Sequence, residues 1–153
     1  MQFSIAAASA LIAASSLGAQ TTPSPDLSTA PPITGNWTYA PTTDGSEAVF
    51  ANSASNSQLW VHCMRATRRV TIARPASAAA PFINVWTSSL SRSVASSYDP
   101  ATGRLTIDLA NFDPLLDAIA SSRGRVAFTV GTQPALVVPP WAQVARVIED
   151  CRV

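Results

Sequence analysis

Two arginines flank a glycine at Arg123-Gly124-Arg125, and their type and spacing suggest chemistry more than any other residues do. A guanidinium group binds a carboxylate or a phosphate through two parallel N–H bonds, and Arg146 or Arg152 could join such a site. The alternative is a solvated turn whose arginines pair with aspartates. Arg123, Arg125 and Arg146 therefore form a candidate anion-binding set.

Aromatic side chains are a second source of candidate binding residues. Any that face outward could form a patch for a sugar or a protein. Trp141 is also included in the candidate binding set. Core packing fits most of the others better, and four of them fall on predicted strands: Trp37, Tyr39, Trp60 and Trp86.

Catalysis would have to use His62, because the chain contains one histidine. On its predicted strand His62 shares a face with Trp60 and Met64, which indicates a packed or surface ring rather than a general base. The chain has no H-E-x-x-H, G-x-S-x-G or glycine-rich phosphate motif and no cluster of metal ligands. We predict that it is not an enzyme and has no catalytic residue, no metal site and no cofactor.

The two cysteines are expected to form one disulfide. Cys63 shares a strand face with Leu59 and Val61, and Cys151 lies on the apolar stripe of the last predicted helix, so both point toward the core. In an oxidising compartment two such cysteines most simply pair, and we predict a Cys63–Cys151 bond. A free catalytic thiol is the alternative, but the adjacent His62 would face the opposite side of the strand.

An export signal is predicted at the start of the chain. Residues 5–19 form an apolar run of 15 residues, rich in alanine and serine, that ends in small residues as cleavage sites do. The run is shorter than the roughly 20 residues that span a bilayer. An ordinary N-terminal helix is the alternative. We predict a signal peptide at 1–19, a disordered linker rich in proline and threonine at 20–34, and one domain at 35–153 that is periplasmic or secreted.

The domain is predicted to be α+β, an antiparallel β-sandwich or open barrel with two short helices. Asp113 can cap a helix that starts at Pro114 and ends at Gly124, and a second helix is expected from Pro140. Short β-type segments bounded by turn residues supply the strands, at 35–40, 46–51, 58–65, 69–74, 82–88, 93–98, 104–109, 126–130 and 136–138. The second helix should bury one face, made of Trp141, Val144, Ala145, Ile148 and Cys151.

Composition limits the partners. Charged residues make up 12% of the chain, the net charge is +1 and neither sign forms a run, so we expect no nucleic-acid partner and no attraction to anionic membranes. No stretch of the mature chain is long and apolar enough to span a bilayer, and we expect a monomer. All ten basic residues are arginine, either through coding bias or because planar guanidinium groups are needed for bidentate contacts.

The order of motifs resembles that of small exported Gram-negative proteins of unknown role. The similar features are G-N-W at 35–37, L-W-V-H-C at 59–63, D-P-L-L-D-A at 113–118, S-R-G-R at 122–125, P-P-W at 139–141 and R-V-I-E-D-C-R at 146–152. The layout is also loosely similar to invasion-associated locus B-like proteins and to periplasmic proteins associated with type VI secretion. The resemblance implies a periplasmic or secreted β domain and supplies no catalytic residue.

Three functions remain open at this point. The first is a non-catalytic exported module that binds a protein or a glycan of the cell envelope. The second is an enzyme-inhibitor-like β domain, for which the loop at residues 75–81 is the candidate for insertion into a partner's cleft. The third is a small hydrolase, which needs His62 or a carboxylate pair beside Arg123 and Arg125 in one concave site.

Overall fold

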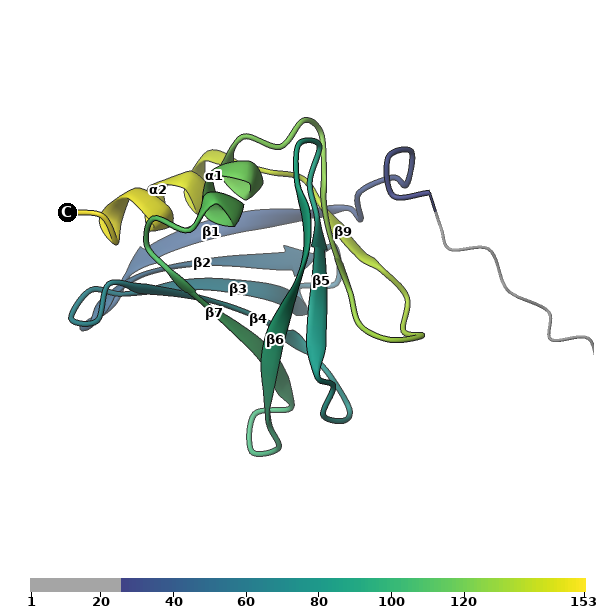
Figure 1. The fold of residues 1–153 in the computed structure, drawn as a ribbon, viewed down its shortest axis with the longest axis horizontal. Coiled ribbons are helices and arrows are strands. Elements are labelled where there is room, and N and C mark those ends of the chain that lie inside the picture. The colour runs from purple at the N-terminus through teal and green to yellow at the C-terminus, as the bar shows by residue number, and fades with distance from the viewer. Residues whose placement is uncertain (1–25) are drawn as a thin grey trace, which may run out of the picture.

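The computed structural model describes residues 26–153 (Figure 1). The predicted signal peptide and the first part of the predicted linker, residues 20–25, lie outside the described residues. The described chain forms, in order, β1 (Gly35–Pro41), β2 (Gly45–Asn52), β3 (Ser57–Met64), β4 (Arg69–Pro75), β5 (Phe82–Trp86), β6 (Ser91–Asp99), β7 (Arg104–Ala110), α1 (Pro114–Ala120), β8 (Val126–Thr129), β9 (Leu136–Val138) and α2 (Ala142–Asp150).

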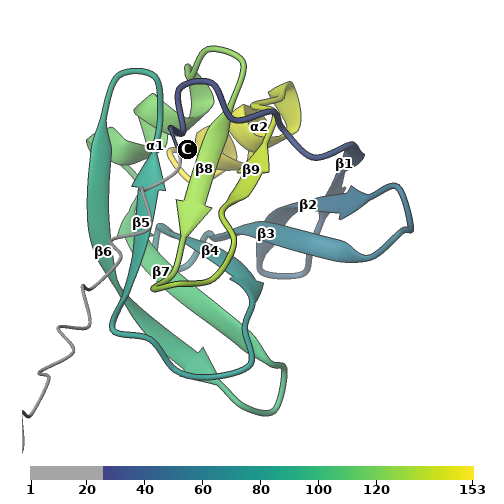
Figure 2. The same ribbon diagram turned by 90° about the vertical axis from the view of Figure 1, so that its right-hand side faces the viewer.

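The strands form one antiparallel sheet in the order β1-β2-β3-β4-β7-β6-β5-β8-β9. The sheet curls into a half-barrel, with β1 and β9 at its two edges (Figures 1 and 2). Hairpins connect β1 to β2, β2 to β3 and β3 to β4. The chain then leaves this group of strands and returns with β7, which pairs with β4. The α+β class and the open-barrel alternative predicted from the sequence are therefore confirmed.

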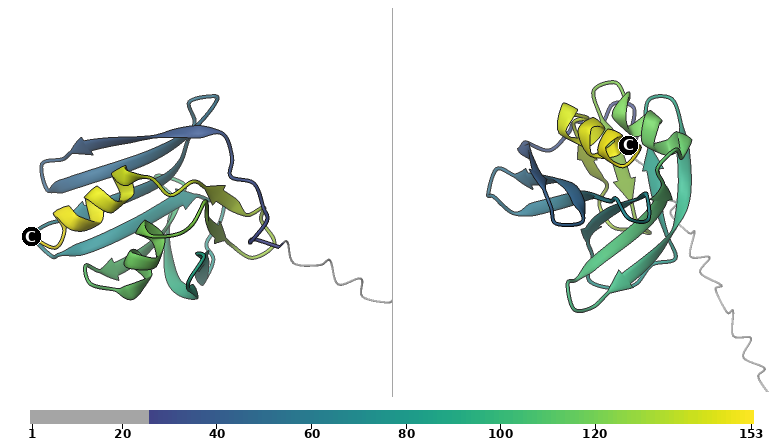
Figure 3. Two further views of the ribbon diagram at one scale, coloured as in Figure 1. Left: turned by 90° about the horizontal axis from the view of Figure 1, so that it is seen from above. Right: turned by 90° about the vertical axis from the view of Figure 1, so that its left-hand side faces the viewer.

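Alternating side chains of the strands fill the inside of the curl. On β3 the residues Leu59, Val61 and Cys63 are buried while their neighbours are half-buried or exposed, and β7 buries Leu105, Ile107 and Leu109 in the same way. This period of two is what a sheet with one covered face requires. The two helices cover the opening of the curl, and α2 packs against β1, β2 and β3 (Figure 3).

The first helix starts as predicted. Asp113 is extended, and its carboxylate accepts the backbone N–H of Leu115 at 2.9 Å, with Pro114 in the first turn. The helix ends earlier than predicted, at Ala120, because the backbone leaves the helical path at Ser121. Gly124 takes a positive φ of 75° inside the following turn, so it shapes the turn and does not end the helix.

The second helix starts two residues later than predicted, at Ala142 instead of Pro140. Trp141 is extended, precedes the helix, and is 46% exposed, so its side chain does not belong to the buried stripe. The buried face consists instead of Val144, Val147 and Ile148, with Cys151 just beyond the last turn.

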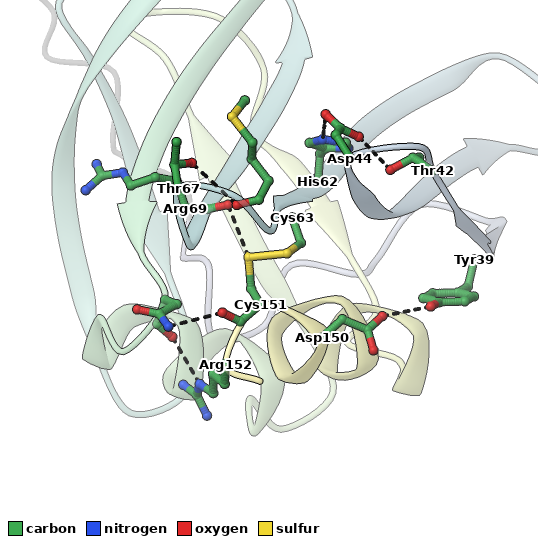
Figure 4. Close-up of a disulfide and its surroundings, with 12 residues drawn as sticks. Tyr39, Thr42, Asp44, His62, Cys63, Thr67, Arg69, Asp150, Cys151 and Arg152 are labelled. Carbon is green, nitrogen blue, oxygen red and sulfur yellow. Dashed lines mark hydrogen bonds and ion pairs between the residues drawn. A yellow bond between two sulfur atoms is a disulfide. The ribbon is translucent and has the colours of Figure 1, made fainter.

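The predicted disulfide between Cys63 and Cys151 is present (Figure 4). Its two Cα atoms are 5.5 Å apart, and both residues are fully buried. The bond connects β3 to the end of α2, across 88 positions of sequence.

The last residues of the predicted linker run along the edge strand β9. The backbone N–H of Ile33 donates to the carbonyl of Val137 at 2.9 Å, and Ile33 packs against the core. Two residues into β1, the Trp37 indole N–H donates to the carbonyl of Pro139 at 2.9 Å. The two edges of the sheet are therefore bridged at this end of the half-barrel.

Within residues 26–153, no helix combines the length and the apolar character that a membrane crossing demands.

Candidate functional site

Arg74 is a charged side chain inside the half-barrel. On β4 the side chains of Val70, Ile72 and Arg74 share one face, so Arg74 takes the third inward position of an otherwise apolar face. Its side chain is 8% exposed, and it is the one buried arginine among the described residues. The strand period thus places a guanidinium group where a hydrophobic residue would be expected.

The guanidinium of Arg74 has hydrogen-bond partners for only some of its N–H groups. Its Nη1 donates to the backbone carbonyl of Phe128 on β8 at 2.8 Å. Its Nε is buried without a partner, and no carboxylate of the described residues lies within 4 Å of the guanidinium. Burial lowers the pKa of Arg74 from its ordinary value, but an arginine remains charged at neutral pH.

Arg74 lines a groove of about 750 Å³, which we call the edge groove. Its walls come from the segment before β1, the β2–β3 turn and the turn before β9, on the side that faces the viewer in Figure 2. The lining contains one charged side chain, that of Arg74, and polar and apolar residues otherwise: Pro31, Pro32, Ile33, Thr34, Asn52, Ser53, Gln58, Pro134, Ala135 and Leu136.

The polar residues of the edge groove present hydrogen-bond donors. The Asn52 side-chain oxygen accepts the N–H groups of Ala54 and Asn56 at 3.1 and 3.0 Å, so the amide nitrogen of Asn52 is left without a partner among the described residues. Gln58 donates one long bond of 3.3 Å to the carbonyl of Asn56. The groove therefore offers N–H groups beside a positive charge, which complements a negatively charged ligand.

The predicted pair Arg123 and Arg125 lies on the turn before β8, outside the lining of this groove. Arg123 is exposed, and its backbone N–H is bound by the Ser88 hydroxyl at 2.9 Å. Arg125 is half-buried and donates through Nη1 to the carbonyl of Ala30, which fastens the segment before β1 to the turn. Neither arginine lines the edge groove, and the Arg125 side chain is used to hold the segment before β1.

Arg146 lies on α2 in different surroundings. Its guanidinium stacks over the Tyr39 ring at 4.0 Å, and the Tyr39 hydroxyl donates to the Asp150 carboxylate at 2.7 Å. Burial raises the pKa of Asp150 and the Tyr39 hydrogen bond lowers it, and the net pKa lies below the ordinary value. Arg146, Tyr39, Ala142 and Gln143 line a second groove of about 390 Å³, the Tyr39 groove, which does not include Trp141.

His62 lies beside two carboxylates at the β1–β2 end of the sheet (Figure 4). Its Nε2 is 3.1 Å from Asp44 and its Nδ1 is 3.9 Å from Glu47, the residue opposite it on β2. Hydrogen bonds from Thr42 and from His62 lower the pKa of Asp44. His62, like Arg123 and Arg125, lines neither the edge groove nor the Tyr39 groove.

No metal-binding cluster occurs within the part of the chain that the structure describes. The loop considered for an inhibitor-like role is fixed at both ends, because Ala76 N–H donates to the carbonyl of Gly103 and Ser96 N–H donates to the carbonyl of Pro81, at 2.9 and 3.0 Å.

Comparison with protein-family models, curated proteins and solved structures finds no match to this chain. The resemblance to small exported Gram-negative proteins therefore stays a prediction.

Sequence reasoning missed Arg74. The signal was its position on a predicted strand, two and four residues after Ile72 and Val70, which places all three on one face.

Proposed function

We propose that this protein is a non-catalytic exported binding module and that the edge groove is its ligand site. The observation that carries the proposal is the Arg74 guanidinium, buried in the wall of an open groove and left without a carboxylate partner among the described residues. The ligand is expected to be a component of the cell envelope.

The energetic cost of Arg74 supports a binding role. A buried charge costs several kcal/mol unless it is paired, so the native state rarely keeps one without a function or a partner. A hydrophobic residue at this position of β4 would pack with Val70 and Ile72 without that cost. A ligand that pairs with Arg74 removes the unsatisfied N–H group.

The size and chemistry of the groove support binding over catalysis. Its volume of about 750 Å³ lies within the range of small-molecule sites. Its lining offers the hydroxyls of Thr34 and Ser53 but no histidine, aspartate or glutamate that could activate them.

Export is supported by the disulfide together with the predicted signal peptide. Disulfides form and persist in oxidising compartments and are rare in the cytosol. The Cys63–Cys151 bond is buried, as a structural disulfide is expected to be. We therefore place the protein in the periplasm or outside the cell.

The test compares the two grooves. ¹H–¹⁵N spectra of the full chain, with its disulfide formed, are recorded against a library of small polar fragments. We expect amide shifts around Ile33, Ser53 and Leu136 that disappear in Ala135→Trp, which fills the edge groove. The matched control, Ala142→Trp, fills the Tyr39 groove and should leave these shifts unchanged.

The opposite pattern contradicts the proposal. Shifts that gather around Tyr39 and Arg146 and are removed only by Ala142→Trp place the ligand site in the Tyr39 groove. If no fragment of the library shifts the amide signals of either groove, the proposal of a small-ligand site is refuted.

A further inference from the structure

We infer that the edge groove recognises its ligand through an oxyanion, a carboxylate or a phosphate group, which is received by the free edge of the Arg74 guanidinium. This inference rests on the proposed function, because it names the ligand chemistry of the same groove. Three features of the described residues lead to it.

The first feature is the geometry of the guanidinium. Nη1 is occupied by the carbonyl of Phe128 at 2.8 Å. The opposite edge carries Nε and Nη2, whose N–H bonds run parallel. Nη2 makes no hydrogen bond within residues 26–153 and is not fully buried, whereas Nε is both buried and unpartnered. An anion in the groove therefore meets Nη2 first. It forms the bidentate pair, the strongest hydrogen-bonding arrangement that arginine offers, when a rotation of the side chain brings Nε to the groove surface.

The second feature is the distribution of carboxylates. Three other arginines of the domain have a carboxylate partner at the surface: Arg69 with Asp108, Arg92 with Asp113, and Arg152 with Asp117. Arg74 is more buried than any of these, so a partner would lower its free energy more. No aspartate or glutamate lines the edge groove. The fold thus leaves its buried guanidinium available to an external anion.

The third feature is the rest of the lining. The amide nitrogen of Asn52 and the side chain of Gln58 can donate to further oxygens of the anion. Pro32 and Leu136 form an apolar wall that can cover a hydrocarbon body. A ligand with an oxyanion at one end and an apolar body at the other complements this surface.

The test follows the Arg74 Nε–H signal in ¹⁵N-edited spectra at pH 6. Its proton is buried, so exchange with water is slow enough for detection. The full chain with its disulfide formed is titrated with sodium acetate, with inorganic phosphate, and with sodium chloride at equal ionic strength. Arg74→Met removes the charge, Arg74→Lys keeps the charge without the fork, and Arg123→Met removes the charge of an exposed arginine as the matched control.

We expect the Nε–H signal to shift with added acetate or phosphate until the shift saturates. Sodium chloride should leave its chemical shift unchanged. Backbone amides of the groove should follow the same titration, which lets the variants be compared. Binding should weaken at least tenfold in Arg74→Met and severalfold in Arg74→Lys, and it should be unchanged in Arg123→Met. Saturation by acetate alone identifies a carboxylate ligand, and saturation by phosphate alone identifies a phosphate ester.

Several outcomes overturn the inference. The inference is overturned if acetate and phosphate shift the groove signals no more than chloride does. It is also overturned if Arg74→Met binds the oxyanions as tightly as the unchanged chain. If that variant does not fold, as judged by its circular dichroism spectrum, unchanged binding in Arg74→Lys overturns the bidentate arrangement. If neutral fragments shift the amide signals of the groove but oxyanions do not, this inference is refuted and the proposed function is retained. If neither the oxyanions nor the neutral fragments shift the signals of groove residues, both this inference and the proposed function are refuted.

Discussion

Cys63 on β3 and Cys151 at the end of α2 are covalently joined, and the backbone around Cys151 is held by further contacts. The Asn111 side-chain amide donates to the carbonyl of Cys151 at 3.1 Å, and the Arg152 Nε donates to the carbonyl of Asn111 at 3.0 Å. The end of α2 is therefore attached to the sheet and also to the segment between β7 and α1. The C-terminal end of the chain closes the opening of the half-barrel through these bonds (Figures 3 and 4).

Removal of this disulfide should strongly destabilise the domain. Closing a loop of 88 residues constrains the unfolded chain by about 4–5 kcal/mol on the entropic model. We expect the double variant Cys63→Ala/Cys151→Ala to lose roughly that free energy of unfolding in urea titrations. The reduced unchanged chain serves as the control for the covalent bond alone. A loss below 1 kcal/mol would show that packing of α2, and not the cross-link, holds the helix in place.

The pairing was predictable because the chain has two cysteines and their faces could be assigned from local patterns. Strand positions were predictable for the same reason, since alternation and turn residues are local. The sheet order was not, because nothing local states that β7 pairs with β4 or that β5 pairs with β8. The start of α2 was misplaced because Pro140 suits a first helical turn, whereas the chain stays extended through Trp141.

Asp113 should contribute stability that depends on pH. Burial raises its pKa, but the hydrogen bonds from Arg92 at 2.7 Å and from the Leu115 N–H outweigh burial, so the net pKa lies below the ordinary value of 3.8. A lowered pKa in the folded state means that the contribution is complete above about pH 4 and is lost as the pH falls through the lowered value. Asp113→Asn keeps an N-cap side chain and removes the charge, so it isolates this effect.

We expect Asp113→Asn to lower the free energy of unfolding by about 1 kcal/mol at pH 7, and the difference from the unchanged chain to shrink below pH 4. Asp113→Ala should lose about 1 kcal/mol more, because the cap is lost as well. The control is Asp117→Asn, whose carboxylate is 63% exposed and whose pair with Arg152 should be worth less than about 1 kcal/mol. A difference for Asp113→Asn that is constant from pH 7 to pH 2 contradicts the assignment.

Trp37 should stabilise the domain by bridging the two edges of the sheet. It lies on the edge strand β1, is 6% exposed, and donates from its indole nitrogen to the carbonyl of Pro139, just after β9. Trp37→Phe keeps an aromatic ring against Phe50 but leaves the carbonyl without its donor. We expect a loss of about 1–2 kcal/mol in urea unfolding.

Trp86→Phe is the matched control for Trp37→Phe, because Trp86 is half-exposed and its indole makes no hydrogen bond within the described chain. Its cost should stay within about 0.5 kcal/mol. Equal losses in the two variants would mean that ring volume, and not the bond to Pro139, accounts for the effect at Trp37.

The candidate site was harder to predict than the fold, for a physical reason. An arginine on a predicted strand is most often at the surface, because burial of its charge is costly. The strand period puts Arg74 on the face of Val70 and Ile72, but only the curl of the sheet brings its guanidinium to the carbonyl of Phe128, a residue 54 positions away. The cluster of Asp44, Glu47 and His62 likewise depends on the register of the β2–β3 hairpin, which places Glu47 opposite His62 and was not predicted.

Gly45 should be required at the start of β2, where two backbones come into close contact. A Cβ atom built on Gly45 lies 2.0 Å from the carbonyl oxygen of Cys63 and 3.0 Å from its carbonyl carbon. The carbonyl is part of the β2–β3 pairing, next to the disulfide, and cannot move independently of it. We expect Gly45→Ala to cost about 2–3 kcal/mol in urea unfolding and to reduce hydrogen-exchange protection of the paired β2 and β3 amides.

The matched control for Gly45→Ala is Gly124→Asn. Gly124 has a φ of 75° and no atom within 4 Å of a built Cβ, so its constraint is conformational and not steric. Asparagine tolerates the left-handed region, and the cost should stay below about 1 kcal/mol. A Gly45→Ala variant as stable as Gly124→Asn would mean that the β2–β3 hairpin can separate at this point, and that close backbone contact there does not fix the position of β3 and its cysteine.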